Sequence, residues 1–298
     1  MTTLIRKTNL NETAAAIRAF FTEKGFIETI TPVVVPAPIP EPSIEAFSVA
    51  GGFLRTSPEP QMKILLAEGA EKIFQIGPCF RKNEMGRLHG EEFTMLEWYE
   101  KNADYSDLIA FTRELLLSVA EKTIGSTSLP VRNDGTSLEL DSDWSILTVE
   151  EAFAKFAESD LRSALAENRF EEVLVEKVEP SLPKNAPVVL KDYPAELAAL
   201  AEVRPGTPPV AERWELYLGG VELANTYTEL RDYEEHKRRF AKFAAERAAL
   251  EMTEYPEDPD FMKAIRRGLP KCAGCALGVD RLVMLLNGEE SIHRQPIE

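Results

Sequence analysis

The most informative segment of this chain reads FRKNEMGRLHGEEFTMLEWYE, residues 80–100. It contains the end of one apolar run, residues 72–80, and the whole of a second, residues 92–99. The stretch between the runs is charged and contains glycine, which predicts an antiparallel pair of strands joined by a long mobile loop. Loops of this length in compact domains are often functional.

The segments around this pair alternate between helical and strand patterns. Helical periodicity is found at residues 11–24, 105–123, 233–250 and 258–267, and strand patterns at 26–31, 212–218 and 221–230. Thr148 with Glu151 forms a capping box that opens a further helix. Five prolines within residues 32–42 indicate an extended, exposed connection. Paired strands with helices between them predict an α+β fold with a mostly antiparallel sheet.

The composition is that of a folded, acidic protein. The 298 residues include 34 Lys and Arg against 50 Asp and Glu, a formal net charge of −16. No segment provides the basic run that broad nucleic-acid binding requires, so that class of function is excluded. Any polyanion must therefore be bound locally, by a few arginines or a metal ion.

No segment resembles a secretion signal or a membrane span, and we expect a cytoplasmic protein without a membrane partner. The three cysteines cannot form a disulfide framework, which suits a reducing compartment. Cys272 and Cys275 are spaced as in redox or zinc motifs. The chain has no second cysteine pair, and its three histidines are far apart in sequence, so incidental small residues are the favoured interpretation.

A Gly-Gly pair at residues 219–220 predicts a tight hairpin. With this turn, Tyr217 pairs with Glu222 and Glu215 with Ala224, and the two glutamates lie diagonally on one face, roughly 7 Å apart. A Mg²⁺ ion that bridges the carboxylates and a polyphosphate would satisfy both charges. A solvated acidic face explains the spacing equally well.

The strand at residues 92–99 places Phe93, Met95, Glu97 and Tyr99 on one face. An aromatic ring, a carboxylate and a phenol could stack on a base and bind an amine, although Phe and Met at a period of two usually belong to a core.

Just upstream, Arg81, Arg87 and His89 crowd the predicted loop. Guanidinium groups there could bind phosphate or carboxylate in bidentate fashion. A solvated loop is the default interpretation of each residue alone.

Three segments resemble, in the correct order, the three signature motifs of class II aminoacyl-tRNA synthetases: GFIETITP at 25–32, the segment at 80–100, and GCALGVDRLVML at 274–285. Three more resemble elements of the lysyl-tRNA synthetase catalytic domain: SPEPQMKILL at 57–66, DYPAELAALA at 192–201 and ELYLGGVELANTYTEL at 215–230. The resemblance implies one catalytic domain over 1–298, with a mostly antiparallel sheet flanked by helices. The charged and weakly periodic residues at about 158–186 predict a helical insertion in it, at about 145–186. The resemblance also implies a homodimer through the region around Pro32.

The first motif begins at Gly25, which leaves no room for the anticodon-binding domain of lysyl-tRNA synthetases, and the charge also argues against tRNA. The chain instead resembles the stand-alone paralogues that activate (R)-β-lysine and join it to a lysine of elongation factor P. Arg87-Leu88-His89 is similar to their Arg-x-His arrangement, and Ala276 stands where lysyl-tRNA synthetases have glycine. One methyl group is worth only about 1–3 kcal/mol of discrimination, so α- and β-lysine both remain open as substrates.

The resemblance also implies residue roles. Arg81 and Arg281 would be catalytic, and ATP would be bound by Arg81, Asn83, Arg87, His89, Phe93 and Arg281. The lysine-type amino acid would be bound by Glu59 at the backbone-side amine, Asn225 at the carboxylate, Glu97, Tyr99 and Glu229 at the distal ammonium, and Ala276 at the floor, with Mg²⁺ on Glu215 and Glu222.

Two features depart from the family pattern. Arg81-Lys82-Asn83 stands where the family has Arg-Asn-Glu, whose glutamate contacts adenine, and Glu84 is displaced by one position. Glu222 and Asn225, three residues apart, would lie on opposite faces of a regular strand. If both serve one site, a β-bulge must separate them.

We therefore expect an ATP- and Mg²⁺-dependent ligase that forms an aminoacyl-adenylate and transfers the amino acid to elongation factor P. The alternatives are a truncated lysyl-tRNA synthetase-like enzyme for tRNA or another acceptor, a ligase for another amino acid, and a non-catalytic regulatory paralogue.

Overall fold

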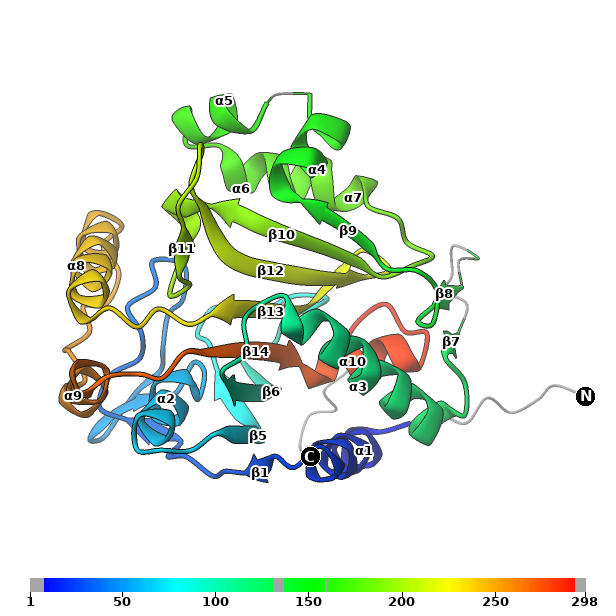
Figure 1. The fold of residues 1–298 in the computed structure, drawn as a ribbon, viewed down its shortest axis with the longest axis horizontal. Helices are drawn as coiled ribbons and strands as arrows, with labels where there is room; N and C mark the ends of the chain where they lie inside the picture. Colours follow the sequence, from blue (N-terminus) through cyan, green and yellow to red (C-terminus); the bar gives the residue numbers. More distant parts are fainter. Residues whose placement is uncertain (1–7, 131–134, 136, 159, 293–298) are drawn as a thin grey trace, which may run out of the picture.

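The main sheet is built from strands spread over most of the chain. The structure, a computed structural model, describes residues 8–130, 135, 137–158 and 160–292. Its main-sheet strands are β1 (Ile27–Glu28), β5 (Lys72–Phe80), β6 (Glu92–Lys101), β9 (Ser145–Thr148), β10 (Val188–Pro194), β11 (Val203–Arg204), β12 (Val210–Leu218), β13 (Val221–Thr228) and β14 (Cys272–Gly278). Within these described residues the order is β1-β5-β6-β14-β13-β12-β10-β9, with β11 beside β12 (Figure 1).

Most neighbouring strands of this sheet are antiparallel. The exceptions are β1 beside β5 and β9 beside β10, which run parallel. Two small sheets lie outside it, one of β2 (Val34–Val35), β4 (Gly52–Leu54) and β3 (Ser48–Val49), the other of β7 (Ser128–Leu129) and β8 (Leu138–Glu139). The predicted α+β fold with a mostly antiparallel sheet is confirmed.

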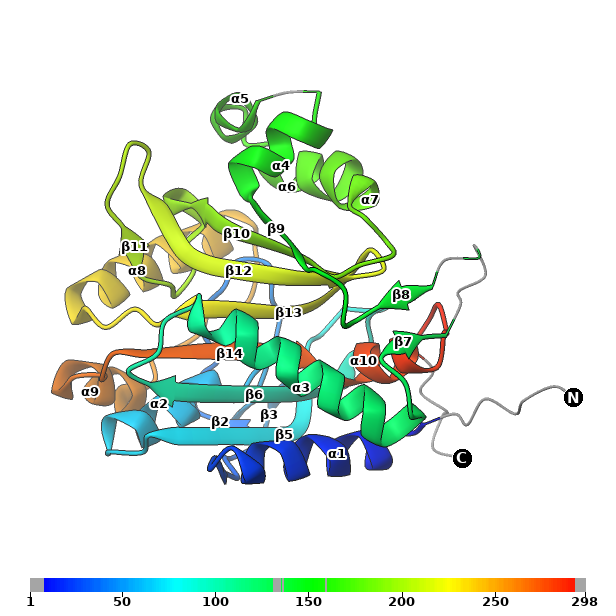
Figure 2. The ribbon, with the colours of Figure 1, turned by 45° about the vertical axis from the view of Figure 1, so that its right-hand side comes forward.

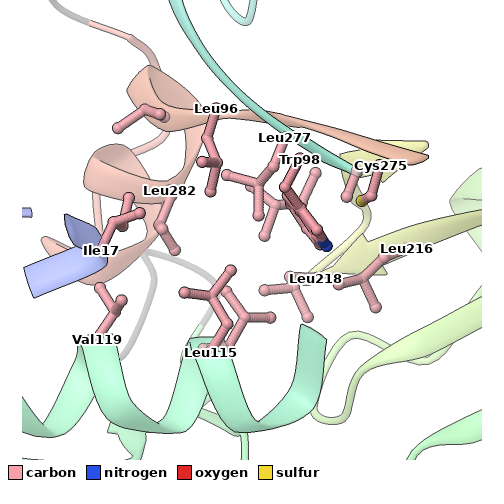
Figure 3. Packing of buried hydrophobic residues seen from close by; sticks show 14 of the residues in the cluster. Ile17, Leu96, Trp98, Leu115, Val119, Leu216, Leu218, Cys275, Leu277 and Leu282 are labelled. Atoms are coloured by element: carbon pink, nitrogen blue, oxygen red, sulfur yellow. The ribbon is translucent and has the colours of Figure 1, made fainter. Parts of the chain in front are cut away.

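Three helices cover one face of the sheet: α1 (Leu10–Glu23), α3 (Asp107–Ile124) and α10 (Val279–Leu286) (Figure 2). The Asn9 side chain caps the N-terminus of α1, and Gly25, with a φ of 78°, follows its end. Figure 3 shows Leu96 and Trp98 of β6 packed with Leu115 of α3 in the main core. Because side chains alternate along a strand, the neighbours of these core residues point to the opposite face of the sheet.

Three further helices pack together near the ends of β5 and β14: α2 (Glu59–Ala67), α8 (Tyr233–Ala249) and α9 (Pro259–Arg267). Their core contains Met62, Leu66 and Phe261. Among the described residues, no helix combines the length and apolarity needed to cross a membrane.

The segment between β9 and β10 is helical and covers the β9, β10 and β12 end of the sheet (Figure 1). It consists of α4 (Val149–Phe156), α5 (Leu161–Ala166), α6 (Phe170–Val173), a π-helical turn at Leu174–Val178, and α7 (Glu179–Ser181). The predicted capping box is present, since the Thr148 side chain accepts from the Glu151 N–H and the Glu151 carboxylate accepts from Thr148. A 3-10 turn at Ala195–Leu197 follows β10.

The proline-rich connection differs from the prediction. It is extended, but Val35, Ala37 and Ile39 are buried, so it is not the exposed connection expected from composition. The strand expected at residues 26–31 is also shorter, because the Thr31 N–H bonds to the side chain of Gln75 in β5 and not to the backbone of that strand.

The β12–β13 hairpin confirms one prediction and corrects another. Leu218 pairs with Val221 across the Gly-Gly turn, and Tyr217 pairs with Glu222, as expected. A β-bulge then shifts the register, so that Glu215 pairs with Asn225 and not with Ala224. The predicted bulge between Glu222 and Asn225 is therefore present, and it brings both side chains to the same face.

Candidate active site

A cavity of about 1420 Å³ opens on the sheet face opposite α1, α3 and α10. One cross-strand row forms part of its floor: Glu97 of β6 pairs with Ala276 of β14, Ala276 with Asn225 of β13, and Asn225 with Glu215 of β12. Paired residues on one face of a sheet have neighbouring side chains. Four of the predicted site residues thus form one line, with a carboxylate at each end.

Nearly all predicted site residues line this cavity. They are Glu59, Arg81, His89, Phe93, Glu97, Tyr99, Glu215, Glu222, Asn225, Glu229, Ala276 and Arg281. The predicted cavity face of β6 is also observed, since Phe93, Met95, Glu97 and Tyr99 all contribute.

Asn83 and Arg87 do not line the cavity. The Arg87 guanidinium donates to the Glu290 carbonyl at 2.6 Å, and the Ile292 N–H returns a bond to the Arg87 carbonyl. Asn83 has a φ of 66°, a left-handed conformation that asparagine tolerates. In the same turn Glu84 reaches the cavity, with its carboxylate 3.8 Å from Arg81.

Arg281 connects the β5–β6 loop to the β12–β13 hairpin. Its guanidinium donates to the Glu222 carbonyl at 2.6 Å and to the Leu88 carbonyl at 3.2 Å, and lies 2.7 Å from His89 Nε2. Burial and the Arg281 charge lower the pKa of His89, so a neutral imidazole can accept this bond. Arg81 lies over the Phe93 ring, 5.1 Å from its centroid. This end of the cavity therefore presents two guanidinium groups and an aromatic face.

The Glu215 and Glu222 carboxylates lie at the hairpin end of the row. Glu215 is buried and accepts from Tyr193 at 2.6 Å, from Tyr217 at 2.7 Å and from Arg213. The alternative of a solvated acidic face is therefore wrong for Glu215. Burial and the nearby Glu215 raise the pKa of Glu222, and Arg281 lowers it.

A magnesium ion fits this pair only with help from a substrate. The described residues contain no group of three or more His, Cys, Asp or Glu side chains that could hold a metal ion. Magnesium is usually bound by one or two carboxylates together with phosphates and water. Two cavity-lining carboxylates, one of them 3.3 Å from Arg281, match the protein's part of that pattern.

The opposite end of the cavity holds a buried charge cluster. Tyr99 donates to Glu97 Oε1 at 2.6 Å, while Glu97 Oε2 is buried without a hydrogen bond to any residue that the structure describes. Burial and the nearby Glu59 raise the pKa of Glu97 to about 8. Burial also raises the pKa of Glu229 to about 7, although Lys63 opposes this shift. Buried carboxylates with free oxygens favour a ligand that brings an ammonium group.

Lys63 is the main residue that the sequence interpretation missed. Its fully buried ammonium donates to Glu59 Oε1 at 2.5 Å. It also forms an ion pair with Glu229, whose Oε2 lies 2.5 Å away. Burial lowers the pKa of Lys63, but the two carboxylates together raise it above its ordinary value. The four-residue spacing of Glu59 and Lys63 on a helix was an available signal.

Gly274 gives the ammonium end of the cavity its shape. A Cβ atom at this position would overlap the Tyr99 ring and lie 2.5 Å from Glu229 Oε1. A glycine is therefore required if Tyr99 and Glu229 are to approach each other across β14. Cys272 and Cys275, on the same strand, are buried thiols whose pKa values are raised by burial.

Comparisons with known proteins agree with this geometry. The sequence profile of the tRNA synthetases class II (D, K and N) matches residues 7–295. The chain is 37% identical over 294 residues to the elongation factor P–(R)-β-lysine ligase of Pectobacterium carotovorum, covering 93% of this chain and 89% of that protein. The chain is 38% identical to the ligase of the same name from Erwinia tasmaniensis, over 91% of this chain and 87% of that protein. It is also 38% identical to the one from Proteus mirabilis, over 93% of this chain and 89% of that protein.

Proposed function

Because the chain belongs to the class II tRNA synthetases of the D, K and N type and is related over most of its length to the elongation factor P–(R)-β-lysine ligases, we propose the following reaction. The enzyme activates (R)-β-lysine with ATP and transfers it to a lysine of elongation factor P. The cross-strand row from Glu97 through Ala276 and Asn225 to Glu215 is the observation that carries this proposal. It connects a site for a distal ammonium with a site for phosphates.

The amino acid is proposed to lie along this row. Glu97 and Glu229 bind the distal ammonium, and the free Glu97 Oε2 supports this role. The carboxylate of the amino acid lies between Asn225 and Arg81. The Asn225 amide donates to the Tyr227 hydroxyl at 3.4 Å, which orients its side chain within the cavity. A substrate held at both ends reacts as if the encounter were intramolecular.

ATP is proposed to bind at the Arg81 and Arg281 end. Phe93 offers a face for the adenine, and His89 lies near the outer phosphates. A Mg²⁺ ion on Glu215 and Glu222, when bound, would supply positive charge beside the phosphates. Glu84 is the acidic residue of this loop that lines the cavity, so it is a candidate adenine contact in place of Asn83.

The reaction proceeds in two steps and needs no protein nucleophile. In the first, the carboxylate oxygen bonds to the α-phosphorus, pyrophosphate leaves, and Arg81 and Arg281 stabilise the charge on the phosphates. In the second, the neutral ε-amine of the acceptor lysine attacks the activated carbonyl, the amide forms and AMP leaves.

We also propose a homodimer that uses the surface around β1. Ile27 is 68% exposed and Ile30 is 97% exposed. Apolar side chains this exposed beside an edge strand support an interface at that edge. Light scattering on the purified protein would give the mass of a dimer, and a monomer after Ile27→Asp and Ile30→Asp together.

ATP–pyrophosphate exchange tests the activation step. The purified protein with Mg²⁺ is assayed against (R)-β-lysine, (S)-β-lysine, α-lysine, ornithine and arginine, with Arg81→Ala as the inactive control. We expect the fastest exchange with (R)-β-lysine, and then a mass increase of co-expressed elongation factor P that equals one lysine residue. Exchange with α-lysine alone would refute the assigned substrate, and no exchange by folded protein would refute the activity.

A further inference from the structure

Glu41 is an acidic side chain of the cavity that no role has yet accounted for. It lies in the proline-rich connection, and its half-buried carboxylate lines the cavity. Its side-chain carboxylate makes no hydrogen bond or ion pair with the part of the chain that the structure describes. Partial burial, followed by the nearby Glu59, raises its pKa.

The backbone around Glu41 is held in place by a buried arginine. Arg247 of α8 donates to the Glu41 carbonyl at 2.8 Å and to the Ile44 carbonyl at 2.6 Å, and pairs with the Glu45 carboxylate at 2.6 Å. Its guanidinium also lies over the Tyr255 ring, 4.1 Å from the centroid. This fully buried arginine also donates to the Thr253 carbonyl at 2.8 Å, so it ties the backbone around Glu41 to the segment that follows α8. A buried charge is costly unless it is well paired, and here the pairing fixes the position of the Glu41 backbone.

The sequence on either side of Glu41 also restricts the backbone at this position. Pro40 and Pro42 flank it, so the preceding φ is restricted and Glu41 itself is kept in an extended conformation. The carboxylate is therefore presented to the cavity by a backbone with little freedom, which lowers the entropy that a bound ligand must remove.

The charges around Glu41 locate it within the cavity. Its electrostatic neighbours are Glu59, Arg81, Arg213 and Lys63. The Lys82 N–H donates to the Glu45 carbonyl at 2.7 Å, which holds the segment that contains Glu41 next to Arg81, the proposed contact of the substrate carboxylate. Glu41 therefore lies toward that end. The pKa of Glu97, at the distal end, is shifted mainly by burial and then by Glu59, Tyr99, Glu229 and Lys63.

Glu59 alone is poorly suited to bind an amine at this end. Its Oε1 already accepts from Lys63 at 2.5 Å, so one of its two oxygens is committed within the protein. An ammonium group has three donors and is bound best by more than one acceptor. Glu41 offers the second carboxylate.

We propose that Glu41, together with Glu59, binds the substrate amine nearest the carboxylate and thereby selects for a diamino acid. This inference rests on the proposed function. Glu41 and Glu59 then bind the proximal amine, while Glu97 and Glu229 bind the distal one. Lys63 lies between the two pairs and keeps them from repelling each other in the absence of substrate.

Two fragments of the substrate allow binding at the two ends of the cavity to be tested separately. (R)-3-Aminohexanoate keeps the carboxylate and the proximal amine of (R)-β-lysine, and 6-aminohexanoate keeps the carboxylate and the distal amine. Each is measured as a competitive inhibitor of (R)-β-lysine-dependent ATP–pyrophosphate exchange, in the wild type, in Glu41→Gln and in the matched control Glu97→Gln. Glutamine keeps the size of the side chain and removes its charge.

In Glu41→Gln, the inhibition constant of (R)-3-aminohexanoate is expected to rise roughly ten-fold to a hundred-fold, and that of 6-aminohexanoate by less than about two-fold. Glu97→Gln should show the reverse pattern. The KM for ATP should stay at the wild-type value in Glu41→Gln. The melting temperature should not fall, because the Glu41 side chain bonds to no described residue and its raised pKa means that its charge does not stabilise the fold.

Equal weakening of both fragments in Glu41→Gln, or no weakening of either, would overturn the inference while leaving the proposed function intact. Absence of exchange in the wild type would overturn both, so the two failures are distinguishable. Glu41→Asp provides a further check, since a charge that is retained on a shorter side chain should restore part of the (R)-3-aminohexanoate affinity if binding depends on the carboxylate.

Discussion

Replacement of Lys63 by methionine should destabilise the protein by an amount that grows with pH. The buried ammonium lies 2.5 Å from Glu59 Oε1 and 2.5 Å from Glu229 Oε2. Methionine fills nearly the same space without the charge, so these carboxylates would face each other and Glu97 without a cation. To avoid this repulsion, the folded protein must hold at least one additional proton.

The size of the effect follows from the cost of that proton. Holding a carboxyl group protonated costs about 1.4 kcal/mol for each pH unit above its ordinary pKa. With the ordinary value of 4.5 for a glutamate, the free energy of unfolding should fall by about 2 kcal/mol at pH 6 and about 5 kcal/mol at pH 8. The upper figure agrees with the loss of about 3–5 kcal/mol expected when a buried pair loses one partner.

Urea unfolding at pH 6 and pH 8 would measure this loss. The matched control is Lys101→Met, which removes a surface ion pair of 2.7 Å with the exposed Glu71 and should cost less than about 1 kcal/mol at either pH. The double variant Lys63→Met with Glu229→Gln removes both the cation and one carboxylate, and should recover much of the stability at pH 8.

Three outcomes would refute this reasoning. The first is a loss in the free energy of unfolding of Lys63→Met that has the same size at pH 6 and pH 8. The second is a loss no larger than that of Lys101→Met, and the third is a double variant that is less stable than Lys63→Met alone. Each would mean that Lys63 is not the charge that balances Glu59 and Glu229.

Three further predictions concern other parts of the molecule. Gly274→Ala would place a methyl group against Tyr99 and Glu229. The KM for (R)-β-lysine in the exchange assay should therefore rise at least about ten-fold, while the KM for ATP stays unchanged. An unchanged KM for the amino acid would contradict the shape assigned to the ammonium end of the cavity. Because burial raises the pKa of Glu97 to about 8, the folded protein keeps a proton there that the unfolded chain releases near 4.5. The unliganded protein should therefore lose stability as the pH rises between these two values, and the melting temperature of Glu97→Gln should decline less steeply over the same range. Parallel pH profiles of the two melting temperatures would count against the buried carboxyl group. Leu115→Ala in the core under α3 should cost about 2–5 kcal/mol in urea unfolding, since its side chain is fully buried, and a loss near zero would be incompatible with this packing.

Features that depend on neighbours in sequence were predictable. The β5–β6 pair follows from two apolar runs, and the hairpin after β12 follows from two glycines with positive φ. The bulge at this hairpin followed from the family resemblance, which assigns Glu222 and Asn225 to one site, because the two could share a face only if one extra residue lay between them. The pairing of Glu215 with Ala224 was wrong because it assumed a hairpin without that bulge.

Features that depend on packing were not predictable in this way. Residue type alone suggested that Arg87 binds phosphate, yet its guanidinium donates to the Glu290 carbonyl, about 200 positions away in the chain. The proline-rich connection looked exposed because prolines are common in exposed loops, but Arg247 of α8 holds it against the cavity.

The sequence by itself determined the fold class and the hairpin, because strand alternation and turn chemistry act over a few residues, and its resemblance to the class II synthetases indicated most of the site residues that we expected and that line the cavity. Only the tertiary structure decided how these charges are balanced. Lys63 and Glu229 are 166 positions apart, and Glu41 and Arg247 are 206 apart. Whether such groups pair, remain free or change their pKa depends on distance and burial, and both arise only when the chain has folded.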